Sequence, residues 1–170
     1  INSWQVPSLL TLSLFSFSQN GDNLSFEHLS MKDGLSMNPV MSIVQDKKGF
    51  LWFGTQDGLN KYDGYKFTIY KTIDGDTASI SDNFTTVQAI DKNGNIWIGT
   101  YNNGLNKYDA QTGKFKRFLK NNSALINNRI HSLLEDKEGQ LWIGTDEGLC
   151  VMDIQKETFI NYPEKYTALK

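Results

Sequence analysis

The chain has 170 residues, of which 39% are apolar and 12% aromatic, and its 17 basic side chains nearly balance its 19 acidic ones. This size fits one domain, and the lack of a basic run in the sequence excludes an electrostatic surface for nucleic acid or anionic lipid. The one cysteine, Cys150, excludes an internal disulfide framework and a cysteine-based zinc cluster, and the two histidines, His28 and His131, offer little to a metal site, so we expect neither a metal nor a cofactor.

Residues 1–18 differ in composition from the rest of the chain, because they carry no charge and are rich in leucine and phenylalanine. Ser16 and Ser18 place small residues where signal peptidase needs them, which makes Gln19 the first mature residue. We interpret residues 1–18 as the remnant of a secretory signal peptide whose basic beginning lies upstream; an apolar first strand is the alternative. The stretch is too short to span a membrane, and nothing later in the sequence is long or apolar enough to do so.

Residues 19–39 form a lead-in to the repeated part of the chain. Within it, Phe26-Glu-His-Leu29 has the aromatic and apolar spacing of a short strand, but no strand-like segment precedes it after the predicted cleavage point. Its role depends on the units that follow.

Three near-copies of one phrase follow at a constant spacing. Trp97 comes 45 residues after Trp52, and Trp142 comes 45 residues after Trp97. Each tryptophan is preceded by the pattern Asp-Lys-x-Gly and followed by Gly-Thr. The other repeated positions are Asp46, Asp91 and Asp136, then Gly49, Gly94 and Gly139, and finally Gly54, Gly99 and Gly144. A repeat of about 40–45 residues built from short strands is the spacing of a β-propeller blade.

Each repeat contains four predicted strands. The first alternates in polarity, as a half-buried strand does, and the Asp-Lys-x-Gly pattern after it predicts a tight hairpin turn. The second strand, around each tryptophan, is apolar on both sides, which is expected between neighbouring blades. A third strand begins near a leucine, and the fourth carries two aromatic residues three positions apart. These aromatic pairs are Phe67 with Tyr70, Phe115 with Phe118, and Phe159 with Tyr162.

We therefore expect an all-β fold with three four-stranded blades at about residues 40–70, 85–118 and 130–162, within a repeated region of residues 40–170. Closed propellers have about four to eight blades, so three blades would leave apolar faces open. We expect the chain to be an incomplete part of a larger, seven-bladed propeller. Phe26–Leu29 would then be an orphan outer strand of the blade that closes the ring, with three partner strands from elsewhere in the whole protein.

The repeated acids are better explained as turn residues than as catalysts. Asp46, Asp91 and Asp136 occupy equivalent places, whereas a glycosidase needs two carboxylates that face each other. The pattern also has one residue more between Asp and Gly than the Asp-box of sialidase propellers. The two arginines, Arg117 and Arg129, form no cluster in the sequence. No Gly-rich phosphate loop, nucleophile elbow or metal-binding spacing occurs, so we predict no catalytic residue.

Two side chains with reactive groups have plain structural explanations. Cys150 stands where the first two repeats have Asn60 and Asn106, and we expect a small buried strand residue rather than a reactive thiol. His131 aligns with positions of differing polarity in the other repeats. We expect it at the surface rather than in a ligand-binding role.

Ligand contacts are expected in loops, because loops vary on a constant frame. In a propeller, the turns between second and third strands share one face with the longer connections, residues 71–83 and 120–128. Their amide, carboxylate and aromatic side chains, with Tyr101 as an exposed ring, suit sugar hydroxyls and ring faces; Asn-Gly and Asp-Gly are also ordinary turn formers. The candidate ligand-binding residues are Gln56, Asp57, Tyr101, Asn102, Asn103, Asp146 and Glu147.

The phrases from Gly49 to Asp63 and from His28 to Ser36 resemble the two-component regulator propeller repeats, and the resemblance covers about residues 25–163. That family forms the periplasmic sensor region of hybrid two-component histidine kinases in Bacteroides-like bacteria. The resemblance implies that the whole protein continues through further blades, an immunoglobulin-like Tyr-rich domain, a transmembrane helix, a histidine kinase, a receiver and an AraC-type DNA-binding domain. Neither histidine of this chain lies in a phosphoacceptor-like helix, so a phosphorelay would belong to the rest of the protein.

The function implied by the resemblance is signal transduction. The segment would lie in the periplasm and sense oligosaccharides released from polysaccharides, in a protein anchored in the inner membrane and acting as a homodimer. The segment itself would neither catalyse a reaction nor contact nucleic acid. Two alternatives stay open: a propeller carbohydrate-active enzyme, a lyase or hydrolase whose catalytic cluster lies in other blades, and a scaffold propeller that binds a protein partner.

Overall fold

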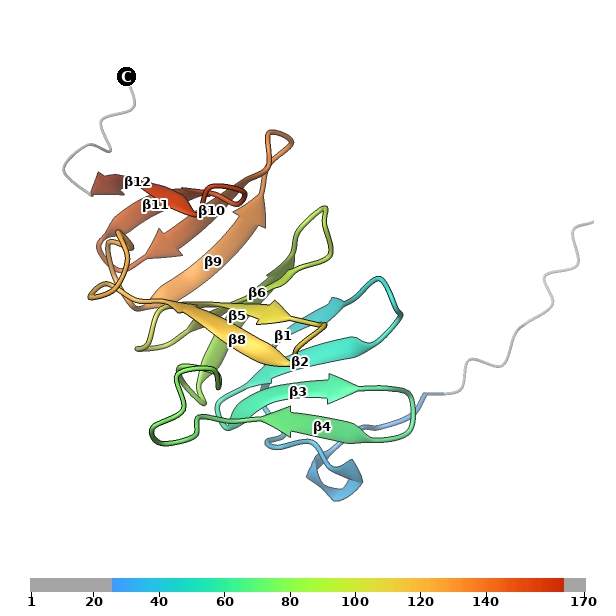
Figure 1. Cartoon of the computed structure of the whole chain (residues 1–170). Coiled ribbons are helices and arrows are strands. Elements are labelled where there is room, and N and C mark those ends of the chain that lie inside the picture. The colour runs from blue at the N-terminus through green and yellow to red at the C-terminus, as the bar shows by residue number, and fades with distance from the viewer. Residues whose placement is uncertain (1–25, 164–170) are drawn as a thin grey trace, which may run out of the picture.

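The computed structural model describes residues 26–163, which are all-β apart from one short 3-10 helix, η1 (Met31–Asp33). The strands form three separate four-stranded antiparallel sheets (Figure 1). The predicted fold class, an incomplete β-propeller with three four-stranded blades, is confirmed. The predicted signal peptide, residues 1–18, and the first part of the lead-in lie outside the described residues.

In every blade the strands follow one another in chain order. Blade 1 contains β1 (Val40–Gln45), β2 (Leu51–Thr55), β3 (Gly58–Tyr62) and β4 (Phe67–Tyr70). Blade 2 contains β5 (Thr85–Ile90), β6 (Ile96–Thr100), β7 (Leu105–Asp109) and β8 (Lys114–Phe118). Blade 3 contains β9 (Ile130–Glu135), β10 (Gln140–Thr145), β11 (Gly148–Asp153) and β12 (Thr158–Pro163).

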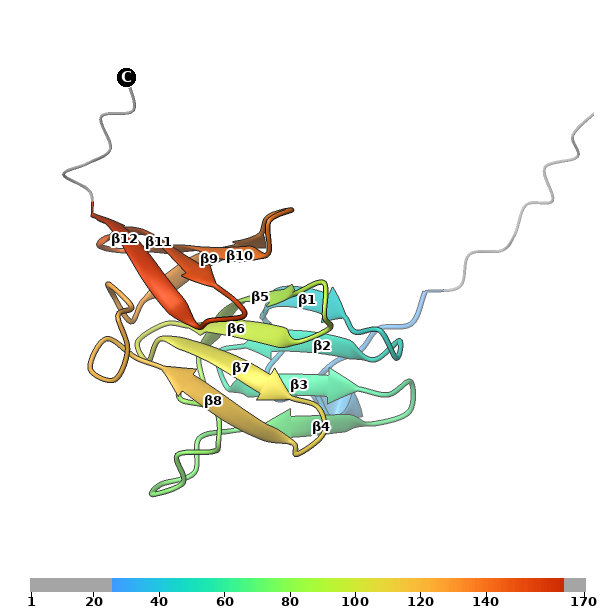
Figure 2. The ribbon, with the colours of Figure 1, turned by 45° about the horizontal axis from the view of Figure 1, so that its top comes forward.

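The first strands of the three blades, β1, β5 and β9, lie next to one another, and Figure 2 shows blade 2 lying across the face of blade 1. Threonine hydroxyls join these neighbouring sheets. The Thr86 hydroxyl donates to the carbonyl of Ile130 at 2.7 Å, and the Thr85 hydroxyl donates to the carbonyl of Thr55 at 3.1 Å. Side chains rather than a backbone ladder therefore connect one blade to the next.

The turn between the first and second strands is organised by its aspartate. In blade 2, Asp91 Oδ1 accepts hydrogen bonds from the backbone N–H groups of Asn93 and Asn95 at 2.9 and 2.8 Å. Asp91 Oδ2 accepts the indole N–H of Trp97 at 3.0 Å. Gly94 has a φ of 89°, which favours glycine, and its N–H donates to the Asp91 carbonyl at 2.8 Å. The equivalent indole bonds join Trp52 to Asp46 at 2.9 Å and Trp142 to Asp136 at 2.7 Å.

The core consists of apolar layers between successive blades. Trp52 of blade 1 is 1% exposed and packs against blade 2, where its ring centroid lies 4.8 Å from that of Tyr108. Trp97 of blade 2 is fully buried in a second layer that includes Leu141 of blade 3. Trp142 of blade 3 has no such cover from the described residues and is only partly buried. Trp52 and Trp97 are therefore each shielded by the blade that follows their own.

The glycine after each tryptophan permits close approach of strands. At Gly99, a Cβ would lie 2.6 Å from Ile130 Cγ2 of blade 3 and 2.8 Å from Val87 Cγ1 of its own blade. The pairing of β5 with β6 is also irregular at this point, between Thr85 and Val87. The space that a side chain would need is thus occupied by the first strands of two blades.

The expected orphan strand Phe26–Leu29 is not a strand in the structure. Residues 26–30 are irregular, His28 included, and Phe26 is 90% exposed. A strand requires a ladder of backbone hydrogen bonds with a neighbour, and no second strand lies beside this segment among residues 26–163. The sequence pattern is typical of a strand, but the segment can form one only by pairing with neighbouring strands, which residues 26–163 do not supply.

Replacing Gly99 with Ala should lower the free energy of unfolding by about 1–3 kcal/mol, because an added methyl group forces Ile130 and Val87 aside. Gly144→Ala is the matched control, since the atom nearest its Cβ is the hydroxyl of Ser132, an exposed side chain that can turn away. Urea unfolding followed by tryptophan fluorescence measures both variants. Equal losses would contradict a blade-to-blade role for Gly99.

The pKa of Asp136 lies below its ordinary value of 3.8, first because the Trp142 indole donates to its carboxylate and then because the Gln140 N–H does so. A carboxyl whose pKa is lowered by folding stabilises the folded chain above its unfolded pKa, and this contribution is lost as the pH falls through the folded pKa. Asp136→Asn should therefore be less stable than the parent chain at neutral pH, with a difference that shrinks below about pH 3.8. Urea midpoints over a pH series test this, and a difference that stays constant in acid would refute it.

Candidate functional site

One end of the blades, which we call the loop face, carries the turns between second and third strands and the connections between blades. The turns are residues 55–58, 100–104 and 145–148, and the connections are residues 71–84 and 119–129. All seven candidate ligand-binding residues lie in these turns. The structure therefore places them on one face of the molecule, although on three different blades.

A threonine closes each turn of the loop face. The hydroxyls of Thr55, Thr100 and Thr145 donate to the carbonyls of Gly58, Gly104 and Gly148 at 2.9, 2.8 and 2.8 Å. Thr55 and Thr100 are fully buried. The turns thus have a constant, buried closing bond, and the residues that differ between blades lie between the threonine and the glycine.

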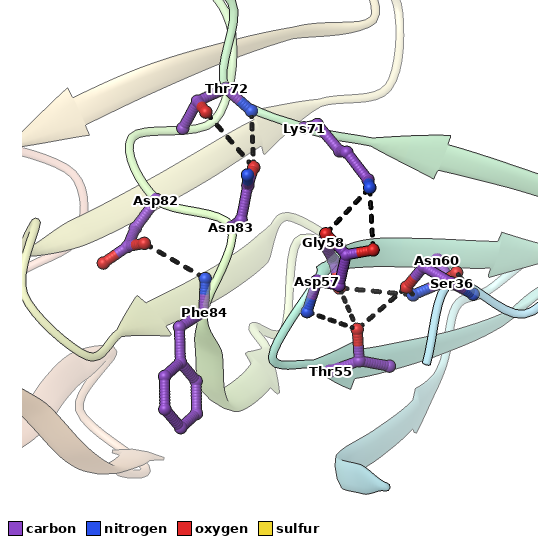
Figure 3. A network of polar contacts seen from close by, with 10 residues as sticks. All are labelled: Ser36, Thr55, Asp57, Gly58, Asn60, Lys71, Thr72, Asp82, Asn83 and Phe84. Atoms are coloured by element: carbon purple, nitrogen blue, oxygen red, sulfur yellow. Dashed lines mark hydrogen bonds and ion pairs between the residues drawn. The ribbon is translucent and has the colours of Figure 1, made fainter. Parts of the chain in front are cut away.

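An asparagine ties each connection to the blade before it. Asn83 Oδ1 accepts the backbone N–H and the hydroxyl of Thr72 at 2.8 and 3.2 Å (Figure 3), and the Asn83 carbonyl accepts the N–H of Gly58 at 2.7 Å. Asn128 Oδ1 accepts the N–H of Lys120 in the same way, at 2.8 Å. Our sequence analysis missed this asparagine, although its spacing of 45 residues was a readable signal.

Blade 1 contributes Gln56 and Asp57 to the loop face. Gln56 is exposed, and Asp57 forms an ion pair with Lys71 at 2.8 Å (Figure 3). Below them, the buried Asn60 accepts the N–H of Ser36 at 2.9 Å and donates to its hydroxyl at 2.8 Å. Asp57 is therefore held by Lys71 of the connection between blades 1 and 2. The hydrogen bonds between Asn60 and Ser36 attach the lead-in to blade 1.

Tyr101 of blade 2 does not offer the free ring face that we expected of it. Its ring stacks on Phe84, with centroids 4.7 Å apart and planes 13° apart, and the guanidinium of Arg129 lies 4.2 Å from its centroid. Phe84 and Arg129 precede β5 and β9 by one residue each, so the packing of blade 3 on blade 2 brings the guanidinium to the ring. The Tyr101 ring is used to join two blades.

Asp146 of blade 3 continues this row of contacts. Arg129 Nη1 lies 3.1 Å from Asp146 Oδ2, and His131 Nε2 contacts Asp146 Oδ1. The hydrogen bond with His131, followed by the charge of Arg129, lowers the pKa of Asp146 below its ordinary value against the opposing effect of desolvation. The residues of this row, which we call the rim cluster, are Phe84, Tyr101, Arg129, His131 and Asp146.

Glu147 forms a separate polar group beside the rim cluster. Lys120 Nζ lies 2.9 Å from Glu147 Oε2, and the Asn127 amide donates to Glu147 Oε1 at 3.0 Å. These two hydrogen bonds, the one from Lys120 first, lower the pKa of Glu147. Glu147 is thus an ionised, exposed acceptor at neutral pH.

Asn102 and Asn103 are exposed, and Asn103 lines an open cavity of about 460 Å³ against the connection 71–84. Arg117 fixes the far wall of this cavity, because its guanidinium donates to the carbonyls of Asp76 and Ser79 at 2.7 and 2.8 Å. The remaining lining residues are Thr72, Ile73, Asp74, Gly75, Thr77, Ser81, Asp82 and Asn83. The cavity is polar and has the size of a small-ligand site.

The acids in the turns between second and third strands, Asp57, Asp146 and Glu147, each lie in an ion pair. Within residues 26–163 no three or more His, Cys, Asp and Glu side chains are grouped to hold a metal ion. Cys150 is buried, and burial raises its pKa to about 11, so its thiol stays protonated at neutral pH.

Phe84, Arg117 and Arg129 are further residues of this face that we did not propose as site residues from the sequence. Phe84 and Arg129 lie 45 residues apart, so their equivalence could have been read from the repeat. Their contact with Tyr101 could not, because it depends on the distance between two blades. Arg117 gives no periodic signal, since it stands on β8 where the other fourth strands differ.

Three antiparallel four-stranded blades with variable turns on a constant frame define a β-propeller. The sequence matches the model of the family described as two component regulator propeller three times, over residues 34–57, 79–102 and 124–147. Each match runs from the end of a connection through the first two strands to the turn of the loop face. The chain therefore carries three two component regulator propeller repeats, which confirms the resemblance seen in the sequence.

Relatives of this chain include a histidine kinase and the extracellular domain of a two component system. Histidine kinase P4 of Formosa agariphila is 44% identical over 73 residues, which are 43% of this chain and 5% of that protein. Another relative is the extracellular domain of BT4673 from B. thetaiotaomicron, which one structure describes as a one component system and another as a hybrid two component system. The first of these structures is 28% identical to this chain, with a TM-score of 0.64 over 78% of this chain and 19% of that chain. PorZ of Porphyromonas gingivalis, a surface component of the type-IX secretion system, is 25% identical with a TM-score of 0.55 over 66% of this chain and 17% of that chain.

The chain thus spans a small part of each of these proteins. In the part that the structure describes, no helix has the length and apolar character to cross a bilayer.

Arg117→Ala should loosen the wall of the cavity, because the carbonyls of Asp76 and Ser79 lose their donor. We expect faster hydrogen exchange over residues 73–80 and a loss of about 1–3 kcal/mol in unfolding free energy. Lys48→Ala, an exposed change in the turn between β1 and β2, is the control and should leave that exchange unaltered. Unchanged exchange in Arg117→Ala would show that the connection holds its shape without the guanidinium.

Proposed function

We propose that the chain is a segment of the ligand-sensing propeller of a hybrid two-component histidine kinase, located in the periplasm and responding to oligosaccharides. The observation that carries this proposal is the set of three in-phase regulator-propeller repeats, together with the identity to a histidine kinase over 73 residues. The relative BT4673 supports the location, since the solved part of that protein is its extracellular domain. In such a protein this segment would supply binding, while the phosphorelay would take place in other domains.

The chemistry of the loop face supports a saccharide ligand. Sugar hydroxyls are recognised by a few well-placed polar groups on a rigid scaffold. Asn102 and Asn103 are exposed amides, and Asp146 and Glu147 are exposed carboxylates whose lowered pKa values keep them as acceptors at neutral pH. Loops that differ between blades allow different relatives to bind different sugars without a change in the frame.

Signalling requires that the ligand favours one arrangement of the whole protein over another. We propose that an oligosaccharide on the loop face changes how the propellers of a homodimer sit together. A membrane helix of the whole protein would transmit the difference to the kinase. The rim cluster and the cavity beside Asn103 are the two parts of this chain that such a ligand would contact.

The lead-in supports a larger, closed ring. Asn38 Oδ1 accepts the N–H of Met31 at 2.9 Å, which is the bond that the asparagines of the later connections make. Leu35 is 5% exposed and holds the place of the buried leucine or isoleucine of those connections. Residues 30–39 are thus built like a connection between blades. We propose that Phe26–Leu29 is the outer strand of the closing blade in a ring of seven.

A protein-binding scaffold is the second candidate, because PorZ has a similar fold at 25% identity and is a component of a secretion system. In that case the exposed loop face would contact a protein partner. The third alternative is a carbohydrate-active enzyme whose catalytic cluster lies in other blades; the turn acids Asp57, Asp146 and Glu147 of this chain are engaged in ion pairs.

Titration calorimetry of the complete extracellular part of the whole protein against panels of oligosaccharides tests the proposal. We expect heat of binding with at least one oligosaccharide, and at least tenfold weaker binding in Asn103→Ala or Asp146→Asn, each of which removes a polar contact from the loop face. Lys48→Ala, in the turn between β1 and β2 at the opposite end of the blades, should bind as the parent does. No heat with any panel member would count against a saccharide sensor, and binding of a defined protein partner that Asn103→Ala or Asp146→Asn weakens would favour the scaffold.

A further inference from the structure

The side of blade 3 that points away from blade 2 is an uncovered apolar face. Leu134 is 67% exposed, Ile160 is 58% exposed and Tyr162 is 45% exposed. Trp142 is only partly buried, whereas its two counterparts are at most 1% exposed. Cross-strand pairing places these side chains on one side of the sheet. The docking face, as we call it, consists of Leu134, Trp142, Leu149, Val151, Ile160 and Tyr162.

The equivalent faces of blades 1 and 2 show what covers such a surface. The Trp52 side of blade 1 packs against Ile96 and Ile98 of blade 2, and the Trp97 side of blade 2 packs against Leu141 and Ile143 of blade 3. In both junctions the cover is the next four-stranded blade. The docking face continues this series, so a further blade is the occupant that its geometry favours over an unrelated protein.

A second contact joins blades 1 and 2 at the opposite end of the blades. Lys47 Nζ in the turn of blade 1 donates to the carbonyl of Lys92, the equivalent residue of blade 2, at 2.6 Å. Lys137 holds this place in blade 3 and is exposed. It can make the same bond to the turn of a further blade.

The docking face nevertheless differs in chemistry from the two junctions inside the chain. Lys61 and Lys107 are the cross-strand partners of Trp52 and Trp97, and their ammonium groups lie 5.5 and 5.3 Å from the indole rings. Trp142 has Val151 as the corresponding partner. The next position across, in the fourth strand, is Thr68 in blade 1, Lys116 in blade 2 and Ile160 in blade 3. The outer part of the face is therefore polar in blades 1 and 2 and apolar in blade 3.

At the junction of blades 2 and 3 these lysines meet a carboxylate. Glu157, in the turn before β12, forms an ion pair with Lys116 and lies 3.8 Å from Lys107. Glu157 has a φ of 55°, in the left-handed region that favours glycine. Gly113 stands at the same point of the turn in blade 2, with a φ of 71°. The ion pairs hold a glutamate where the backbone favours glycine.

We propose that the docking face binds a further blade of the same repeat. The surface of that blade in this junction is apolar from its inner strands to its outer strand, and it has no carboxylate at the position that corresponds to Glu157. A carboxylate there would lose water against Val151 and Ile160 without a cation to pair with, which is unfavourable. The third junction is thus apolar where the second depends on charge. This inference concerns assembly and holds whichever ligand the loop face binds.

A duplicated blade inserted into the full chain tests the proposal. A copy of residues 119–162 is inserted directly after Tyr162, which holds the same place in blade 3 as Phe118 in blade 2, and residues 163–170 follow the copy. The copied Glu157 then faces Val151 and Ile160. In a second version the copied glutamate is replaced by glycine, as Gly113 stands in blade 2.

Hydrogen exchange of β10 and β11 in the receiving blade reports docking, because these strands become covered. We expect at least tenfold greater protection by the glycine version than by the glutamate version. Glycine also suits the positive φ at the copied position, and this effect alone could increase protection. The decisive variant therefore carries Val151→Lys and Ile160→Lys in the receiving blade, which supply cations for the copied glutamate. These lysines should reverse the order, so that the glutamate version protects more.

Leu134→Lys in the receiving blade should lower the protection in both versions. Equal protection by the two versions, or an order that the paired lysine substitutions leave unchanged, would overturn the proposed chemistry of the junction. Exchange of β10 and β11 that neither version slows would overturn the assignment of this face to a blade.

Discussion

The bond between a turn carboxylate and an indole N–H is the interaction on which each blade depends. In blade 2 the Asp91 carboxylate accepts two backbone N–H groups of the hairpin turn with one oxygen and the Trp97 indole with the other. The same group therefore orders the turn and orients the largest side chain of the second strand. An indole with its one donor satisfied can be buried at no cost in unpaired hydrogen bonds, and it then forms the layer on which the next blade packs.

This arrangement makes every blade dependent on its neighbour. The sheets have no common backbone ladder, so apolar layers, threonine hydroxyls and ion pairs hold them together. The junctions are alike in their inner part, where Gly99 and the first strands meet, and differ toward the outer strands. There the second junction uses Glu157 with two lysines, while the free face of blade 3 is apolar. Repetition of the frame thus leaves room for each junction to have its own chemistry.

The loop face follows the same division between constant and variable parts. Buried threonine hydroxyls close the turns, and asparagines attach the connections. The side chains between them are Gln and Asp in blade 1, Tyr and two Asn in blade 2, and Asp and Glu in blade 3. Substitutions at these positions leave the hydrogen bonds of the frame intact.

The sequence by itself determined the number of repeats, the order of the strands and the turn chemistry, because these depend on contacts within about 45 residues that recur three times. It also indicated which turns share one face. Only the tertiary structure decided what neighbouring blades do to each other's side chains. Tyr101 looked like a free ring in its turn, but Phe84 and Arg129 engage it; Phe26–Leu29 has a strand pattern, but an irregular backbone without partner strands in the described chain. Spacing in sequence fixes where a residue lies within its blade, whereas its exposure depends on a surface that a different blade provides.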